Sequence, residues 1–202
     1  MPRISAAERR NDFVRAAVDV IATHGIDGAT TRRIAEQAQA PLATLHYCYN
    51  SKEDLLADVF DHVAGRFREA ITDSDPHADL VETARALLRG VMEFYLESPN
   101  LGSTALEVTN WARRQNRDHA ITVYDKAMET LRATLRSAAA DQPLEPETVD
   151  HLAYVIASLA DGFGLNWLTY GDRSAAAEQM QVTTSVLESW LATRLETSPA
   201  AL

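Results

Sequence analysis

Residues 26–56 read IDGATTRRIAEQAQAPLATLHYCYNSKEDLL, and they carry the most informative pattern in the chain. It holds two short helical patterns, residues 31–38 and 42–47, and Pro41 ends the first of them. Thr30 or Thr31 can cap the first helix, because a threonine hydroxyl accepts a hydrogen bond from a free backbone N–H. Such a pair is typical of a helix-turn-helix, whose second helix enters the major groove of DNA. Short helix pairs also occur in many other folds, so this pattern alone does not establish DNA binding.

The chain before this stretch carries a longer helical pattern. From Phe13 to Ile21 the apolar residues recur at i, i+3, i+4, i+7 and i+8, which places them on one face of a helix. The pattern predicts a helix over residues 6–24. Gly25 then supplies the left-handed residue that commonly closes a helix.

The chain after residue 51 carries longer helical patterns separated by short breaks rich in proline, glycine and asparagine. Ser51 is a good cap for the first of these helices. The expected helices are 52–72, 76–97, 103–112, 117–140, 145–170 and 174–196. No stretch alternates in the way that predicts a strand. The sequence therefore predicts an all-α protein of about nine helices, with a three-helix DNA-binding domain over 1–53 and a larger helical effector-binding and dimerisation domain over 54–202.

Composition narrows the class of protein. Of 202 residues, 46% are hydrophobic and 24% are charged, which is typical of a globular protein and not of a disordered or collagen-like chain. No apolar run approaches the roughly 18 residues that cross a bilayer. The lone Cys48 cannot form an intramolecular disulfide, and residues 1–10 are charged where a signal peptide is apolar. We therefore expect a cytoplasmic protein.

The charge distribution limits where a polyanion can bind. The formal net charge is −10, but residues 1–53 carry a balance of +1 and the remainder carries −11. Because phosphate is repelled by an acidic surface, any contact with nucleic acid is expected in the first quarter of the chain.

Specific positions in this first quarter carry a family resemblance. They are the Gly25 turn, the Thr30-Thr31 pair, Ile34-Ala35, Thr44-Leu45, Tyr49, Ser51-Lys52-Glu53 and Leu55-Leu56. In order and spacing they resemble the DNA-binding domain of the TetR family of bacterial transcriptional regulators. The chain departs from the usual family pattern at Gln39 and Ala43, where glycine is common, and at His46, where tyrosine is common. The turn at Gln39 favours a positive φ, so we expect strain there, and His46 has a shorter reach to phosphate than tyrosine.

The predicted DNA contacts are Thr31, Arg32, Leu42, Ala43, Thr44, His46, Tyr47 and Lys52. From spacing alone Arg32 and Arg33 form a solvated pair, whereas the resemblance assigns Arg32 to a guanine edge. Thr31 and Lys52 begin helices, where backbone N–H groups favour phosphate. The short side chains that open residues 42–47 permit close approach to a thymine methyl, and His46 and Tyr47 supply donors. Arg3, Arg9 and Arg10 are an ordinary charged terminus or, in the family, flank the phosphate backbone.

The last two predicted helices are apolar on two sides, so each needs two partners. Their second faces carry Tyr154, Leu165 and Leu168, and Val182, Val186 and Trp190. We expect a homodimer held by a four-helix bundle of two such pairs, in agreement with the family, whose members are mostly homodimers on palindromic DNA. The alternative is a deeply buried helix pair in a monomer.

The resemblance also implies a small-molecule pocket in the helical body. The candidate lining is Phe94, Tyr95, Asn110, Trp111, Tyr124, Met128, Asp161, Asn166 and Trp167, which combines aromatic area with a few polar groups. Each aromatic side chain is also compatible with an ordinary core. Asp161 precedes Gly162 near the middle of a helix, where a carboxylate needs a donor, a ligand or an interface partner.

An enzyme and a protein–protein adaptor are the two alternative classes of protein. The six histidines show no metal-binding spacing, and no phosphate-binding loop or nucleophile motif is present, so we expect neither an enzyme nor a cofactor or metal. A helical protein–protein adaptor would show no sequence-selective affinity for DNA. The sequence favours a ligand-responsive repressor that a small molecule releases from a palindromic operator, with no membrane partner.

Overall fold

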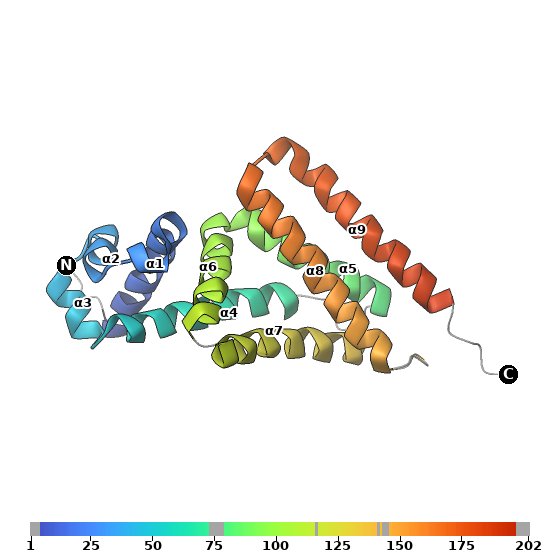
Figure 1. Cartoon of the computed structure of the whole chain (residues 1–202), viewed down its shortest axis with the longest axis horizontal. Helices are drawn as coiled ribbons and strands as arrows, with labels where there is room; N and C mark the ends of the chain where they lie inside the picture. Colours follow the sequence, from blue (N-terminus) through green and yellow to red (C-terminus); the bar gives the residue numbers. More distant parts are fainter. Residues whose placement is uncertain (1–4, 73–78, 116, 141, 143–145, 197–202) are drawn as a thin grey trace. The chain divides into compact units, whose positions relative to one another are not determined.

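The computed structural model describes residues 5–72, 79–115, 117–140, 142 and 146–196 (Figure 1). Within these residues the chain forms nine helices and no strand, which confirms the predicted all-α fold. The helices are α1 (Ala6–Gly28), α2 (Thr31–Gln37), α3 (Leu42–Cys48), α4 (Lys52–Thr72), α5 (Leu80–Glu97), α6 (Pro99–Gln115), α7 (Arg117–Ala138), α8 (Pro146–Tyr170) and α9 (Arg173–Glu196).

Side-chain caps explain where the first helices begin and end. Ser5 and Glu8 form a reciprocal capping box at the start of α1, and Gly25 interrupts that helix with φ 68°. At the start of α2, the Thr30 hydroxyl accepts a hydrogen bond from the Arg33 N–H at 3.3 Å. Ser51 accepts one from the Asp54 N–H at 3.0 Å, which confirms Ser51 as the cap of α4.

The start of α6 differs from the sequence-based prediction. We expected the helix to begin at residue 103, because Pro99 suggested a break. In the structure Pro99 is the first residue of α6, where its missing N–H costs no hydrogen bond. The carbonyl of Ser98 accepts a hydrogen bond from the Gly102 N–H at 3.0 Å, so the apparent break is the first turn.

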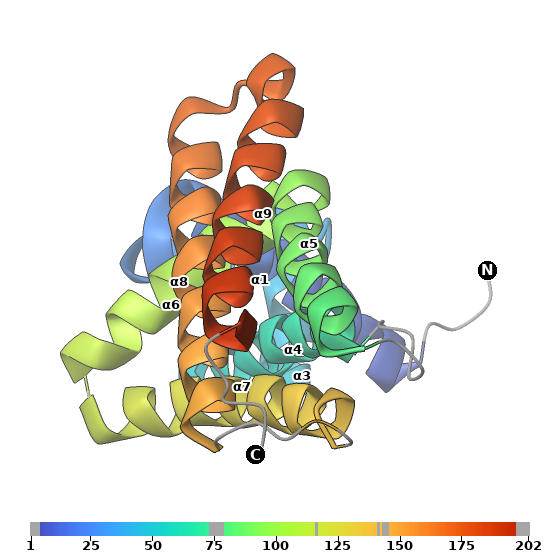
Figure 2. The same ribbon diagram turned by 90° about the vertical axis from the view of Figure 1, so that its right-hand side faces the viewer.

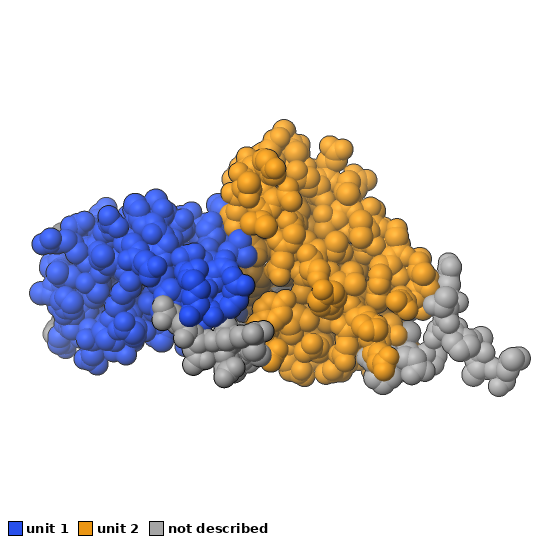
Figure 3. Space-filling view, viewed as in Figure 1, with its two compact units in different colours: residues 1–66, 98–121 blue, residues 67–97, 122–202 orange. Residues whose placement is uncertain are grey.

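The described chain divides into two compact units (Figure 3). Unit 1 comprises residues 1–66 and 98–121, and unit 2 comprises residues 67–97 and 122–202. This division into units reflects packing alone. The assignment of DNA binding to residues 1–53, and of effector binding and dimerisation to residues 54–202, therefore stays a prediction.

Unit 1 is organised around α1, which packs against α2, α3 and α6. The apolar stripe predicted on α1 is buried, and Phe13 and Ile21 are at most 1% exposed. On the α6 side, the buried Thr104 hydroxyl donates a hydrogen bond to the carbonyl of Val18 at 3.0 Å. Residues 98–121 therefore help to form the core on which α2 and α3 rest.

In unit 2, α5, α8 and α9 pack together, and Figure 2 shows them side by side. Leu87 and Leu88 on α5, Leu152 on α8 and Leu187 on α9 are at most 1% exposed. Outside this core, Arg85 Nε lies 2.7 Å from Glu188 Oε1 and ties α5 to α9. None of the described helices carries an apolar window long enough to cross a bilayer.

Gln39 has a left-handed backbone conformation, with φ 51°, as we expected for the turn between α2 and α3. A side chain in this region costs about 1–2 kcal/mol, and glycine removes that cost but loses more entropy on folding. We expect Gln39→Gly to raise the free energy of unfolding by about 0.5–1 kcal/mol, measured by denaturant titration. Gln37→Gly, two residues earlier at the last position of α2, is the control and should destabilise. A less stable Gln39→Gly variant would contradict the strain assigned to this turn.

Candidate nucleic-acid interface and effector site

Helix α3 presents one exposed face and one buried face. Leu45 is 1% exposed and anchors the helix, while Ile34 does the same for α2. Ala43, His46 and Tyr47, spaced i, i+3 and i+4, share the face opposite Leu45 and are exposed. Tyr47 is 86% exposed, which is unusual for a tyrosine without a ligand. This face can therefore contact a macromolecule without disturbing the core.

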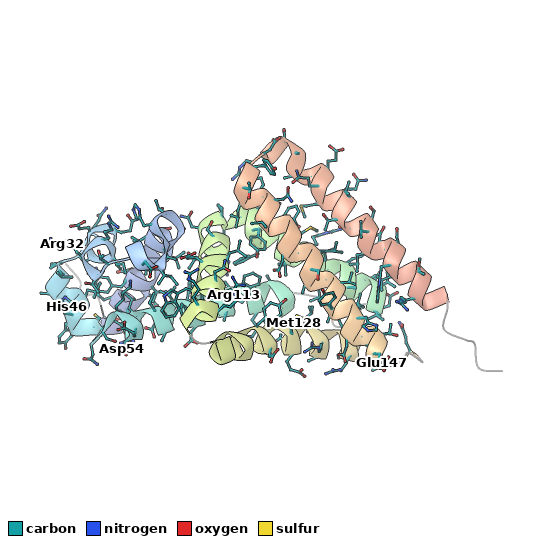
Figure 4. All side chains as sticks on the ribbon, viewed as in Figure 1. Arg32, His46, Asp54, Arg113, Met128 and Glu147 are labelled. Carbon is teal, nitrogen blue, oxygen red and sulfur yellow. The ribbon has the colours of Figure 1, made fainter. Side chains whose placement is uncertain are left out.

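The two neighbouring arginines of α2 differ in their surroundings. Arg33 Nη1 donates a hydrogen bond to the carbonyl of Gly28 at 2.8 Å. Arg32 is exposed and makes no such bond within the described part of the chain. Figure 4 shows Arg32 on α2 and His46 on α3 at the same end of unit 1. The remaining predicted contacts Thr31, Leu42 and Thr44 are half-buried.

Lys52 lies at the start of α4, as predicted, but its ammonium group also has a structural partner. Nζ donates a hydrogen bond to the carbonyl of Ile26 at 2.7 Å. This carbonyl follows the Gly25 interruption of α1. An ammonium group has three donors, so the bond leaves two for a phosphate. A contact between Lys52 and DNA stays a prediction.

The backbone N–H of Ile26 faces a carboxylate from α6. Glu107 Oε1 lies 3.4 Å from that nitrogen, a long hydrogen bond. Arg114 Nη2 lies 3.9 Å from the same oxygen. Lys52 from α4 thus binds the carbonyl of Ile26, and Glu107 from α6 accepts the hydrogen bond from its N–H.

A second polar network joins α1, the end of α3 and α4. Arg10 Nε and Nη2 lie 3.2 and 2.9 Å from Asp58 Oδ2, and Nη1 donates to the carbonyl of Cys48 at 2.8 Å. The Tyr49 hydroxyl donates to the same carboxylate oxygen at 2.8 Å, and its ring lies 4.3 Å below the guanidinium carbon. Burial, and then the hydrogen bond to Asp58, raise the pKa of Tyr49. The network fixes the end of α3 to both long helices.

This network accounts for one of the three terminal arginines. Arg10 is held by Asp58, and this bond raises the pKa of its guanidinium group. Arg9 lies 3.5 Å from Asp12. Arg3 lies outside the described residues.

The nine residues predicted to line an effector pocket fall in both units. Asn110 and Trp111 belong to unit 1, where the Trp111 ring packs edge-on against Phe60 at 5.9 Å. The other seven belong to unit 2. Of these, Phe94, Tyr95, Met128 and Trp167 are buried, and Tyr124, Asp161 and Asn166 are exposed.

An aromatic cluster lies at the end of α5. The Phe67 ring lies 4.5 Å from Phe94 and 6.0 Å from Tyr95, between ring centres. Phe94 and Tyr95 meet edge-on at 5.7 Å. Burial raises the pKa of Tyr95, and the charge of Asp161 raises it further. Tyr95 is therefore the described link between the aromatic cluster and the mid-helix carboxylate of α8.

Helices α8 and α9 expose apolar side chains on the faces that sequence analysis assigned to a partner. Tyr154 and Leu165 on α8 are 69% and 60% exposed, and Val182 and Val186 on α9 are 57% and 48% exposed. The core faces of the same helices are buried. Leu168 and Trp190 are half-buried.

Comparison with known families decides the class of the protein. Residues 13–59 match the model described as "Bacterial regulatory proteins, tetR family". Residues 81–192 match the model described as "BetI-type transcriptional repressor, C-terminal". The chain belongs to the TetR family. It is a DNA-binding transcriptional repressor, and the family and its curated members are regulators rather than enzymes.

Three proteins illustrate what this TetR-family chain resembles. The nicotine-responsive repressor HdnoR of Paenarthrobacter nicotinovorans is 29% identical over 82% of this chain and 86% of its own. The repressor AcnR of Corynebacterium diphtheriae is 26% identical over 85% and 89%. The fatty acid degradation regulator FadR of Bacillus halodurans shares the fold, with a TM-score of 0.68 at 20% identity over 89% and 94%.

Several residues that shape the sites of this TetR-family repressor were not predicted. Asp58 and Glu107 hold groups that lie far away along the sequence, and no local pattern marks them. Phe67 contacts two of the predicted aromatic residues from α4.

Proposed function

We propose that two copies of this repressor bind a palindromic operator, with α3 of each copy in the major groove. The exposed face of α3, opposite the buried Leu45, carries this proposal. Arg32 on α2 is expected to read a guanine edge, and Ala43 permits close approach to the bases. In such dimers the two recognition helices lie about 34–36 Å apart, one turn of DNA. The operator lies in the cytoplasm, where we expect the protein to act.

We propose that α8 and α9 form the dimer interface. Their exposed apolar side chains Tyr154, Leu165, Val182 and Val186 support a self-complementary surface, because a contiguous apolar patch usually marks an interaction site. Two copies of the pair would form a four-helix bundle.

We propose that a small molecule bound in unit 2 lowers operator affinity. Of the nine candidate lining residues we keep the seven that belong to unit 2, and we centre the site on Tyr95 and Asp161. The curated relatives include a nicotine-responsive repressor, which supports a small organic effector here. A coupling of about 1–3 kcal/mol would change operator affinity roughly 5- to 150-fold, and DNA would weaken effector binding by the same factor. Helix α4 begins beside the DNA face and is the proposed link.

Titrating the protein into DNA taken from the region beside its gene tests the proposed operator binding. We expect selective binding that weakens steeply with salt, because phosphate contacts release counterions. Arg32→Ala should cost about 1–3 kcal/mol and relax the sequence preference. Arg113→Ala removes an exposed arginine from α6 of the same unit and is the control. No selective binding, or equal losses in both variants, would refute the assignment.

A further inference from the structure

Helix α3 depends on its neighbours for its position. It has seven residues, and helices this short are marginal in water without packing partners. Pro41 precedes its first residue and supplies no side-chain cap. Leu45 is the one residue of α3 that is buried. A single central anchor leaves the helix free to turn about that point, so a fixed direction requires a second anchor.

The second anchor lies at the end of α3. The last carbonyl of the helix, that of Cys48, accepts a hydrogen bond from Arg10 Nη1 at 2.8 Å. The next residue, Tyr49, is 2% exposed, and the centre of its ring lies 4.3 Å from the guanidinium carbon of Arg10. One arginine of α1 thus contacts both residues at which α3 ends.

Arg10 is itself held by α4. Its Nε and Nη2 lie 3.2 and 2.9 Å from Asp58 Oδ2, and the Tyr49 hydroxyl donates to the same oxygen at 2.8 Å. A guanidinium group is planar and presents its donors at fixed angles, so the bonds to Asp58 fix the direction in which Nη1 points. Asp58 therefore acts on α3 through Arg10 and Tyr49.

The same arrangement disfavours a contact between Arg10 and phosphate. A phosphate at the guanidinium group would approach the Asp58 carboxylate, whose negative charge offsets the positive charge of the arginine. Three of the five guanidinium N–H donors are already used within the protein. Arg10 differs in this from Arg32, which is exposed and makes no hydrogen bond within the described residues.

We propose that Arg10 is a positioning residue for DNA recognition, which sets the direction of α3 through Asp58 and Tyr49 and does not bind phosphate. The family resemblance instead places Arg10 beside the phosphate backbone. A misdirected α3 loses contacts with base edges, while the charges that attract phosphate remain. The loss therefore falls on selective binding. This inference rests on the proposed placement of α3 in the major groove.

Two substitutions test this role, in titrations of the DNA fragment beside the gene and of a random-sequence duplex of equal length. Arg10→Lys keeps the positive charge but lacks the planar fork, and Asp58→Ala removes its acceptor. We expect each to weaken binding to the selected fragment about tenfold and to change binding to the random duplex by less than about twofold. The double variant should lose no more than either single variant, because both remove one shared contact.

A phosphate contact by Arg10 predicts different signs. Arg10→Lys would then bind the fragment nearly as tightly as the wild type, because lysine also binds phosphate. Asp58→Ala would bind both duplexes more tightly, because it removes a negative charge beside the backbone. Either result would overturn the inference.

The salt dependence is a second readout, which a loss of stability alone would not move. Each phosphate contact contributes about 0.9 to the slope of log affinity against log salt, hence nearly two for a dimer. Arg10→Gln removes the charge and should change this slope by less than about one. A slope lower by nearly two would assign Arg10 to phosphate.

Matched controls come from the same two helices. Arg9→Lys alters the neighbouring arginine of α1, which lies 3.5 Å from Asp12. Asp61→Ala removes an exposed carboxylate one turn after Asp58 on α4. Both should leave affinity and selectivity unchanged, and circular dichroism should show that all variants stay folded. Losses in these controls equal to those of Arg10→Lys and Asp58→Ala would contradict a specific role.

Hydrogen exchange in the DNA-free protein separates this inference from the proposed function. Arg10→Lys and Asp58→Ala should speed exchange of the amides of residues 46–49 severalfold relative to Arg9→Lys, and leave those of α5 unchanged. Unchanged exchange at residues 46–49, or faster exchange with full selectivity for the fragment, would overturn the inference. If the wild type binds no fragment selectively, the proposed function fails, and the exchange result still decides whether Arg10 holds the end of α3.

Discussion

Leu165→Arg is expected to convert the dimer to a monomer and to lower operator affinity at least 100-fold, about 3 kcal/mol. Leu165 is 60% exposed in the single chain and lies on the proposed α8–α9 interface. The substitution acts twice in a symmetric dimer: it removes two apolar contacts, each worth about 1.5–3 kcal/mol, and buries two unpaired charges. Losing the dimer also loses simultaneous binding to both half-sites.

Light scattering and operator titration measure the two effects separately. Ala133→Arg adds the same side chain at an exposed position on α7 and should remain dimeric. Circular dichroism should show that both variants keep their helices. If the Leu165→Arg protein remained a dimer at micromolar concentration, the proposed interface would be wrong.

Gly90→Ala is expected to destabilise the protein by about 3 kcal/mol, the upper end of the usual cost of overpacking. A Cβ at Gly90 would collide with the backbone carbonyl oxygen of Ala70, which cannot rotate away as a side chain can. Alanine would otherwise favour a helix over glycine by about 1 kcal/mol. The collision therefore has to exceed that gain.

Gly65→Ala separates these two effects. Gly65 lies in α4 with no atom within 4 Å of an ideal Cβ, so alanine there should stabilise by about 1 kcal/mol. Thermal melting should move the two variants in opposite directions, by about 2–4 °C per kcal/mol for a chain of this size. A Gly90→Ala protein that melts at or above the wild type would show that α4 can shift away from α5.

Local chemistry explains why so much of the helical fold was predictable. An apolar stripe or a helix cap acts through residues that are close together in the sequence. The effects of Thr30, Ser51 and Gly25 could therefore be predicted from the sequence directly. Pro99 misled the prediction because proline both ends helices and begins them, and only the hydrogen bonds show which applies.

Site residues could be predicted from the sequence only where helical periodicity determines which face of a helix is exposed. The exposed face of α3 follows from the burial of Leu45. In contrast, Arg10 and Asp58 lie 48 residues apart, and nothing local pairs them. The sequence marked Asp161 as an unusual mid-helix acid, but the tyrosines near it come from α5 and α7 and required the tertiary structure.

The construction of unit 1 from two separate stretches has a consequence for engineering. Residues 98–121 supply Thr104, which binds the Val18 carbonyl, and Glu107, which faces the Ile26 N–H. A chimera that joined residues 1–66 to another sensor would leave these groups of α1 without their native partners. Biosensors made by exchanging DNA-reading segments would need to carry both stretches, or to match the recipient's α6 to this surface. Recombination at a single crossover is correspondingly restricted, because every cut between residues 66 and 98 divides the unit.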